Sequence, residues 1–108
     1  MVLLHAPKER ALLVGVGNIG SQLAPLAAPV FGFVRLVDRD VVEPHNVENQ
    51  SYFPSDVGRP KVDVIADRLA QAYPHLEIER FAGDLQDLPL GKIADVDVAL
   101  AGLDSLSA

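Results

Sequence analysis

Residues 11–20 read Ala-Leu-Leu-Val-Gly-Val-Gly-Asn-Ile-Gly, an apolar run that passes directly into three spaced glycines. Such a run is typical of a parallel strand buried on both faces, which we expect over Ala11–Val16. Gly15 permits a tight turn, Gly17 lets the backbone approach a phosphate, and Gly20 permits close packing of the next helix. Because a helix N-terminus offers free N–H groups to an anion, the stretch predicts a nucleotide-binding turn rather than a purely structural one.

The rest of the chain alternates helix and strand patterns. Apolar residues recur at helical spacing from Asn18 to about Pro29, and Phe33–Asp38 reads as a second buried strand. A second helix is predicted from Lys61 to about Tyr73. Leu76–Phe81 reads as a half-exposed strand at a sheet edge, and Asp97–Ala101 as a buried one. This alternation predicts an α/β, Rossmann-like fold with flanking helices and a mostly parallel sheet in the order 3-2-1-4.

Composition bounds the class of protein. A chain of 108 residues is one domain, over residues 1–108, and its net charge of −6 argues against nucleic acid or an anionic membrane as partner. The absence of cysteine excludes disulfides, thiolate zinc sites and a cysteine nucleophile, and it fits the cytoplasm. No window is apolar for long enough to span a bilayer. A cytoplasmic domain without a nucleic-acid or membrane partner is therefore expected.

The second predicted strand ends in an acid, and a long polar segment follows it. A carboxylate at the position of Asp38 accepts hydrogen bonds from ribose hydroxyls in folds of this kind. From Arg39 to Pro60 the chain has little periodicity, and structureless loops this long are usually functional or disordered. Burial of Tyr52 and Phe53 would anchor the segment. Lys61 follows it, where a lysine can lie near nucleotide phosphates and neutralise developing charge.

Four motifs resemble the ThiF/MoeB/ubiquitin-activating family. They are Gly15–Gly20 (GVGNIG), Asp38–Gln50 (DRDVVEPHNVENQ), Gly58–Lys61 (GRPK) and Gly102–Ser105 (GLDS), in the family's order and near its spacing. The resemblance covers nearly the whole chain. It implies an adenylyltransferase that uses ATP and Mg²⁺ to activate the C-terminus of a ubiquitin-like or sulfur-carrier protein.

The resemblance also implies roles for individual residues. Asp38 would bind the ATP ribose, and Asp40 would support the loop. Asn46 and Lys61 would approach the phosphates, and Asp104 would hold Mg²⁺ or its water shell. Lys61, Asn46 and Asp104 are thus the implied catalytic residues. The implied ATP-binding residues are Gly15, Gly17, Gly20, Asp38, Asp40, Asn46 and Lys61.

Several positions depart from the family's pattern. Asn49 stands where the family has an arginine, which removes a fixed cation from the γ-phosphate region. Arg39 and Arg59 are the candidates to replace that charge. Asn18 stands where the family has a glycine, and His45 where it has a serine. The departures leave two alternatives open: an NAD-binding Rossmann domain of a dehydrogenase or redox-sensing module, and a scaffold that keeps the fold without ATP.

The C-terminal region holds two aspartates and the last predicted strand. Asp95 and Asp97 read as solvated loop charges ahead of the last predicted strand. The pattern corresponds to the N-terminal half of the family's fold, so Val96–Ala101 would present an apolar face and an open edge. We therefore expect either a fragment of a longer protein or a homodimer, or another partner chain that completes the sheet.

Overall fold

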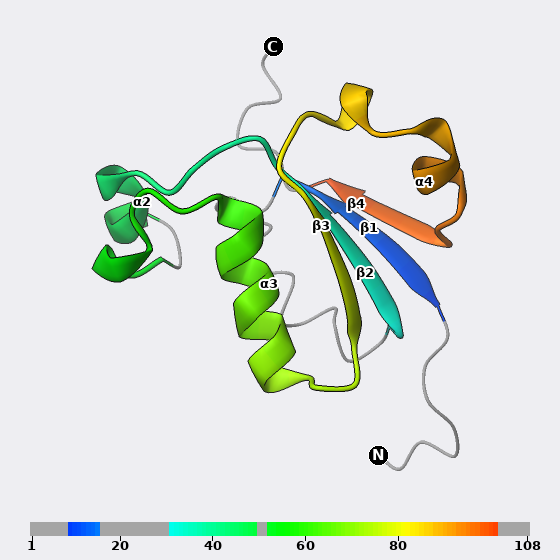
Figure 1. Cartoon of the computed structure of the whole chain (residues 1–108), viewed down its shortest axis with the longest axis horizontal. Coiled ribbons are helices and arrows are strands. Elements are labelled where there is room, and N and C mark those ends of the chain that lie inside the picture. The colour runs from blue at the N-terminus through cyan, green and yellow to red at the C-terminus, as the bar shows by residue number, and fades with distance from the viewer. Residues whose placement is uncertain (1–8, 16–30, 50–51, 102–108) are drawn as a thin grey trace.

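A parallel four-stranded sheet forms the centre of the molecule (Figure 1), in a computed structural model that describes residues 9–15, 31–49 and 52–101. Its strands are β1 (Arg10–Val14), β2 (Phe33–Val37), β3 (Glu77–Phe81) and β4 (Val98–Ala101). Their order is β3-β2-β1-β4, with every neighbouring pair parallel. The predicted order is confirmed. β1 therefore lies between β2 and β4, where the strand order reverses. The turn that leaves β1 starts at this switch point, where ligands bind in open α/β sheets.

Helix α3 (Lys61–Ala72) covers one face of the sheet and ends one residue before the predicted boundary (Figure 1). Its buried stripe is Val62, Ile65, Ala66 and Leu69, the i, i+3, i+4, i+7 spacing of one helix face. These residues join one core cluster with alternate residues of β1 and β2, including Leu13 and Leu36. The apolar periodicity alone was enough to predict this element, because one face had to be buried.

The sequence pattern suggested a long segment without regular structure between β2 and α3. The structure shows short ordered elements there instead. The segment contains the short helix α2 (Pro44–Asn49) and the 3-10 turn η2 (Pro54–Asp56). Asp56 closes η2 by accepting the N–H of Phe53 at 2.8 Å, and Arg68 of α3 donates to the same carboxylate at 2.9 Å. Elements this short depend on such polar contacts rather than on periodicity, so the sequence pattern did not reveal them.

Only one of the two predicted aromatic anchors is buried. Tyr52 lies in the core cluster beside α3, whereas 65% of Phe53 is exposed. The guanidinium of Arg68 lies 5.0 Å from the centroid of the Phe53 ring. The predicted burial is therefore confirmed for Tyr52 and wrong for Phe53. Adjacent side chains of an extended chain point in opposite directions, so only one of the two can face the core.

The opposite face of the sheet carries a buried arginine. Arg35, at the middle of β2, is 3% exposed and donates from Nη1 to the carbonyl of Lys92 at 2.6 Å and to Asp95 at 2.7 Å. Its Nη2 donates to Glu79 of β3 at 3.0 Å. Lys92 and Asp95 come from helix α4 (Leu90–Ala94) and its C-terminal cap, in the connection that also holds the 3-10 turn η3 (Leu85–Asp87).

Asp95 and Asp97 are therefore not merely solvated loop charges. Asp95 also accepts a hydrogen bond from Nη2 of Arg10 at 3.0 Å, and Asp97 accepts the backbone N–H of Arg10 at 2.8 Å. The hydrogen bond from Arg35 lowers the pKa of Asp95 below its ordinary value. The two aspartates thus fasten the connection through α4 to the first two strands.

The two outer strands differ from each other. β3 is half exposed at one edge, as predicted. β4, which begins at Val98, was predicted as a buried type of strand with an open edge; it lies at an edge of the described sheet, but Val98 is 37% exposed and most of the strand faces outward. The reason is its place at the other edge of the described sheet, where only β1 pairs with it. Among the described residues, no helix has both the length and the apolarity needed to cross a membrane.

Candidate functional site

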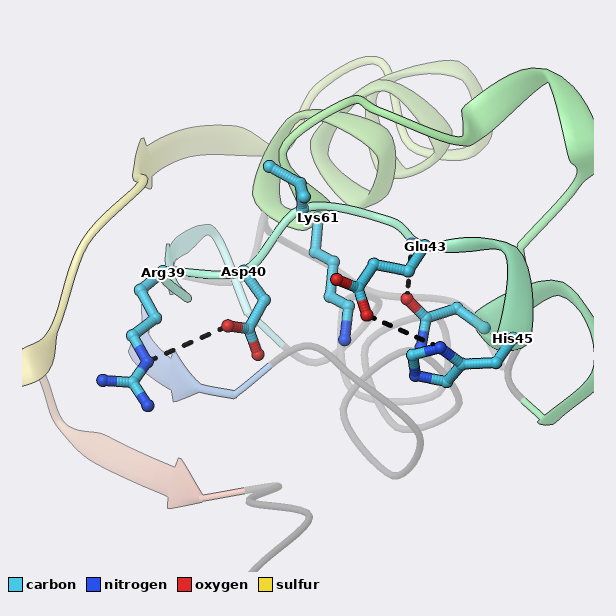
Figure 2. Close-up of a pocket in the computed structure, with 7 residues that line it drawn as sticks. Arg39, Asp40, Glu43, His45 and Lys61 are labelled. Atoms are coloured by element: carbon cyan, nitrogen blue, oxygen red, sulfur yellow. Dashed lines mark hydrogen bonds and ion pairs between the residues drawn. The ribbon is translucent and has the colours of Figure 1, made fainter.

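A pocket of about 380 Å³ lies where the segment after β2 meets α2 and the start of α3 (Figure 2). Three residues predicted from the sequence, Asp40, Asn46 and Lys61, line this one pocket. The structure therefore brings together side chains from two separate motifs. The described residues that line it are Arg39, Asp40, Val41, Glu43, His45, Asn46 and Lys61.

Lys61 is the buried cation of the pocket. It is 4% exposed, and its ammonium points into the space between Asp40 on one side and Glu43 and His45 on the other (Figure 2). Its backbone N–H donates to the carbonyl of Asp40 at 3.0 Å. The ion pairs found among residues 9–15, 31–49 and 52–101 leave its ammonium without a carboxylate partner. Because this ammonium opens into the pocket without a carboxylate partner among the described residues, the pocket is suited to an anion.

A tight turn positions this lysine. Gly58 has a φ of 92°, and its N–H donates to the carbonyl of Val42 at 2.8 Å. The N–H of Val42 donates in return to the carbonyl of Arg59 at 2.8 Å, and Pro60 forms an antiparallel bridge with Val41. The GRPK motif therefore works as a unit that ties the start of α3 to the chain leaving β2.

The conformation of Gly58 gives a matched pair of substitutions. A Cβ at Gly58 or at Gly91 would meet no heavy atom within 4 Å, but only Gly58 has a positive φ. We expect Gly58→Ala to destabilise the fold by about 1 kcal/mol, since an L side chain is strained there. Gly91→Ala lies in α4 and should stabilise by up to about 1 kcal/mol. Urea unfolding of both variants tests this pair, and equal effects would contradict it.

Asn46 and Asp38 both shape the backbone around the pocket. The Oδ1 atom of Asn46, which is 2% exposed, accepts the N–H of Glu43 at 2.7 Å. This is half of a capping box at the start of α2. Oδ1 of Asp38 accepts the N–H of Asp40 at 2.8 Å and so fixes the turn after β2. Asp38 does not line the pocket itself, which leaves its predicted ribose contact as a prediction.

The glycine turn is described only at its start. Gly15 has a φ of 82°, and its N–H donates to the carbonyl of Val37 at 2.8 Å. The first glycine is therefore required by its backbone conformation, as the sequence predicted. Gly17, Gly20 and Asp104 lie outside the described residues, as does the predicted helix from Asn18 to Pro29. Their proposed roles stay predictions.

The structure separates the two arginines considered as replacements for the family's missing one. Arg39 lines the pocket, although it is exposed and lies 3.8 Å from Asp40 and 3.5 Å from Asp84. Arg59 instead donates to Asp67 of α3 at 2.6 Å, a hydrogen bond that lowers the pKa of that carboxyl group. Glu43 and His45 were not assigned roles from the sequence, and only the folded pocket distinguishes them from their polar neighbours.

Comparison with known proteins agrees with this architecture. The ThiF family model matches residues 4–108. The NEDD8-activating enzyme E1 catalytic subunit of Arabidopsis thaliana is 32% identical over 101 residues, which cover 92% of this chain and 22% of that protein. The molybdopterin-synthase adenylyltransferase of Salmonella typhimurium is 35% identical over 80 residues, covering 72% of this chain and 32% of that protein.

A solved structure shares the fold. E. coli tRNA N6-threonylcarbamoyladenosine dehydratase in complex with ATP superposes with a TM-score of 0.82 at 24% identity, covering 91% of this chain and 42% of that chain. This chain therefore spans less than half of that structure and about a third or less of the two curated relatives. The family match covers nearly the whole sequence and favours this assignment over a dehydrogenase, so the chain belongs to the ThiF family.

Proposed function

We propose that this chain is the ATP-binding part of a ThiF-type enzyme that adenylates the C-terminal carboxylate of a ubiquitin-like or sulfur-carrier protein. The observation that carries the proposal is the largely buried side chain of Lys61, whose ammonium opens into a pocket that Asp40 and Asn46 also line and lacks a carboxylate partner among the described residues (Figure 2). Such a group favours a ligand with dense negative charge, which a triphosphate supplies more fully than the pyrophosphate of a dinucleotide.

The reaction needs little from the protein beyond positioning and charge. A carboxylate oxygen bonds to the α-phosphorus of ATP while the bond to the bridging oxygen breaks, and pyrophosphate leaves with that electron pair. Lys61 would donate to phosphate oxygens as charge builds on them, and Arg39 would add a second cation at the pocket rim. Asp38 would hold the ribose. An enzyme that carries out this reaction is an adenylyltransferase.

Mg²⁺ belongs to the proposal as the companion of ATP. In the described part of the chain, no group of three or more His, Asp or Glu side chains could hold a metal ion. Asp40 and Glu43 are the two carboxylates that line the pocket. We propose that Mg²⁺ arrives bound to the ATP phosphates and is held at Asp104.

The partners follow from the same reading. The relatives include a NEDD8-activating enzyme subunit and a molybdopterin-synthase adenylyltransferase, so a small carrier protein is the proposed substrate. We also propose that a second copy or another chain covers the apolar edge strand β4. Light scattering distinguishes the 11.6 kDa monomer from larger assemblies and would contradict this if only the monomer is found. The cytoplasm stays the proposed compartment.

Calorimetric titration with MgATP and with NADH tests the proposed ligand. We expect MgATP to bind and NADH to give no saturable heat. Binding of NADH without MgATP would support the dehydrogenase alternative and overturn the proposal. Binding of neither ligand would favour a scaffold that has kept the fold alone. Exchange of labelled pyrophosphate into ATP, in the presence of a candidate carrier protein, would then measure adenylation directly.

A further inference from the structure

A carboxylate and an imidazole face each other on the wall of the pocket. Nδ1 of His45 lies 3.5 Å from a carboxylate oxygen of Glu43, and both side chains line the same space as the Lys61 ammonium (Figure 2). Both are exposed, so neither is held in place by burial in the core. They are therefore accessible to a ligand that enters the pocket.

Among the residues that the structure describes, the fixed charges that line the pocket cancel when the histidine is left out. Arg39 and Lys61 contribute two positive charges, and Asp40 and Glu43 contribute two negative ones. These are the charged groups that line the pocket with His45 among the described residues: Glu43 from its own segment, Lys61 from α3, and Arg39 and Asp40 from the turn after β2. A triphosphate adds several negative charges to this neutral set. Further positive charge would therefore strengthen its binding.

His45 is the group in the pocket that can supply that charge, because imidazole changes its protonation near neutral pH. With a neutral imidazole, the pair of Glu43 and His45 carries one negative charge and repels an anion. With an imidazolium, the pair is neutral, and the ring can donate to Glu43 from one nitrogen and to the anion from the other. One proton thus converts a repelling wall of the pocket into a donating one.

We propose that the pocket binds a polyphosphate together with one proton, which His45 takes up. This deepens the proposed function, since it rests on ATP as the ligand of the same pocket. The bound anion favours the imidazolium, so by linkage the affinity falls as the pH rises through the range in which histidine loses its proton. The structure assigns His45 to ligand binding and Glu43 to holding the imidazolium.

The test compares variants with the same ligand, because the terminal phosphate of ATP itself titrates near neutral pH. Wild type, His45→Gln and Glu43→Gln are titrated calorimetrically with MgATP and with sodium tripolyphosphate, at about pH 6 and about pH 8. Buffers with different protonation enthalpies count the protons taken up. His75→Gln is the matched control, since His75 is an exposed histidine that does not line the pocket.

From the lower to the higher pH, the affinity of wild type and of His75→Gln should fall about five-fold more than the affinity of His45→Gln. This figure assumes that the anion binds the imidazolium form about ten-fold more tightly than the neutral form. Glu43→Gln should bind more tightly than wild type at the higher pH, because it removes the repelling charge. Tripolyphosphate should show the same pH effect as ATP. A pH effect seen only with ATP would overturn the proposal, since it would place His45 against the nucleoside.

Two results separate the role of His45 from the binding of ATP itself. Binding of MgATP with equal proton uptake in wild type and His45→Gln would overturn the role of His45 and leave ATP binding in place. Absence of MgATP binding by wild type at both pH values would overturn both.

Discussion

Replacing Lys61 with methionine is expected to weaken binding of MgATP about 50-fold, the loss of a charge-assisted hydrogen bond of roughly 2–2.5 kcal/mol. Methionine keeps most of the apolar length of the lysine stem, so the start of α3 should stay packed. The free protein should stay close to wild type in stability, because the ammonium opens into the pocket and has no carboxylate partner to lose among the described residues. Weaker ligand binding with unchanged stability is the signature of a binding residue.

Lys92→Met is the matched control for this prediction. Lys92 is exposed on α4 and forms an ion pair with Glu79, away from the pocket. Calorimetry should therefore give the wild-type affinity for MgATP in Lys92→Met. An unchanged affinity of Lys61→Met for MgATP would contradict the role of the Lys61 ammonium in binding the phosphates. A large loss of stability in Lys61→Met would show that the lysine is structural.

Replacing Arg35 with methionine is expected to lower the free energy of unfolding by about 2–4 kcal/mol. The guanidinium is buried and joins three elements through Glu79 of β3, the carbonyl of Lys92 and the cap residue Asp95. Methionine fills the volume but makes none of these hydrogen bonds. Both carboxylates keep partial access to water, which holds the cost below that of stranding fully buried charges.

The same cluster predicts a pH dependence of stability. The hydrogen bond from Arg35 lowers the pKa of Asp95 below 3.8, and those from Arg35 and Lys92 lower the pKa of Glu79 below 4.5. A carboxyl group whose folded-state pKa is lowered contributes stability above its unfolded pKa, and this stability is lost as the pH falls through the folded value. Acid should therefore destabilise wild type below about pH 4.5, and Arg35→Met should show a smaller acid loss.

Arg80→Met is the control for the Arg35 prediction. Arg80 lies exposed on β3, with Asp63 at 3.2 Å and Asp67 at 3.6 Å on α3. A surface ion pair of this kind is worth about 0–1 kcal/mol, so this variant should stay close to wild type. Urea unfolding at neutral pH and at about pH 4 measures all three proteins. Equal losses in Arg35→Met and Arg80→Met would contradict the importance given to burial.

Much of the architecture followed from local patterns. The apolar runs of β1 and β2, the glycine after β1 and the helical stripe of α3 predicted the order of elements, since each must bury an apolar face. The sheet order then followed from right-handed crossovers. The GRPK motif predicted that Lys61 would lie near the residues that follow β2, and it does so because Gly58 and Pro60 bring the two segments together.

Other features depended on contacts between distant residues. Arg35 reads in the sequence as a polar interruption of a strand, and only the carboxylates contributed by β3 and the α4 connection make its burial tolerable. The edge position of β4 followed from the predicted strand order, whereas the exposure of most of its residues appears only in the folded sheet. The short elements α2 and η2 depend on hydrogen bonds that the side chains of Asn46 and Asp56 accept from the backbone N–H groups of Glu43 and Phe53.

The sequence by itself determined the family, the alternation of strands and helices, and the lysine of the candidate site, because these depend on residue type and spacing along the chain. The tertiary structure decided what surrounds that lysine. It buried most of the Lys61 side chain, left its ammonium facing the pocket, and placed Glu43 and His45 in the lining of the same pocket (Figure 2). Burial and the balance of charges are properties of groups that meet in space, and no spacing in the sequence specifies them.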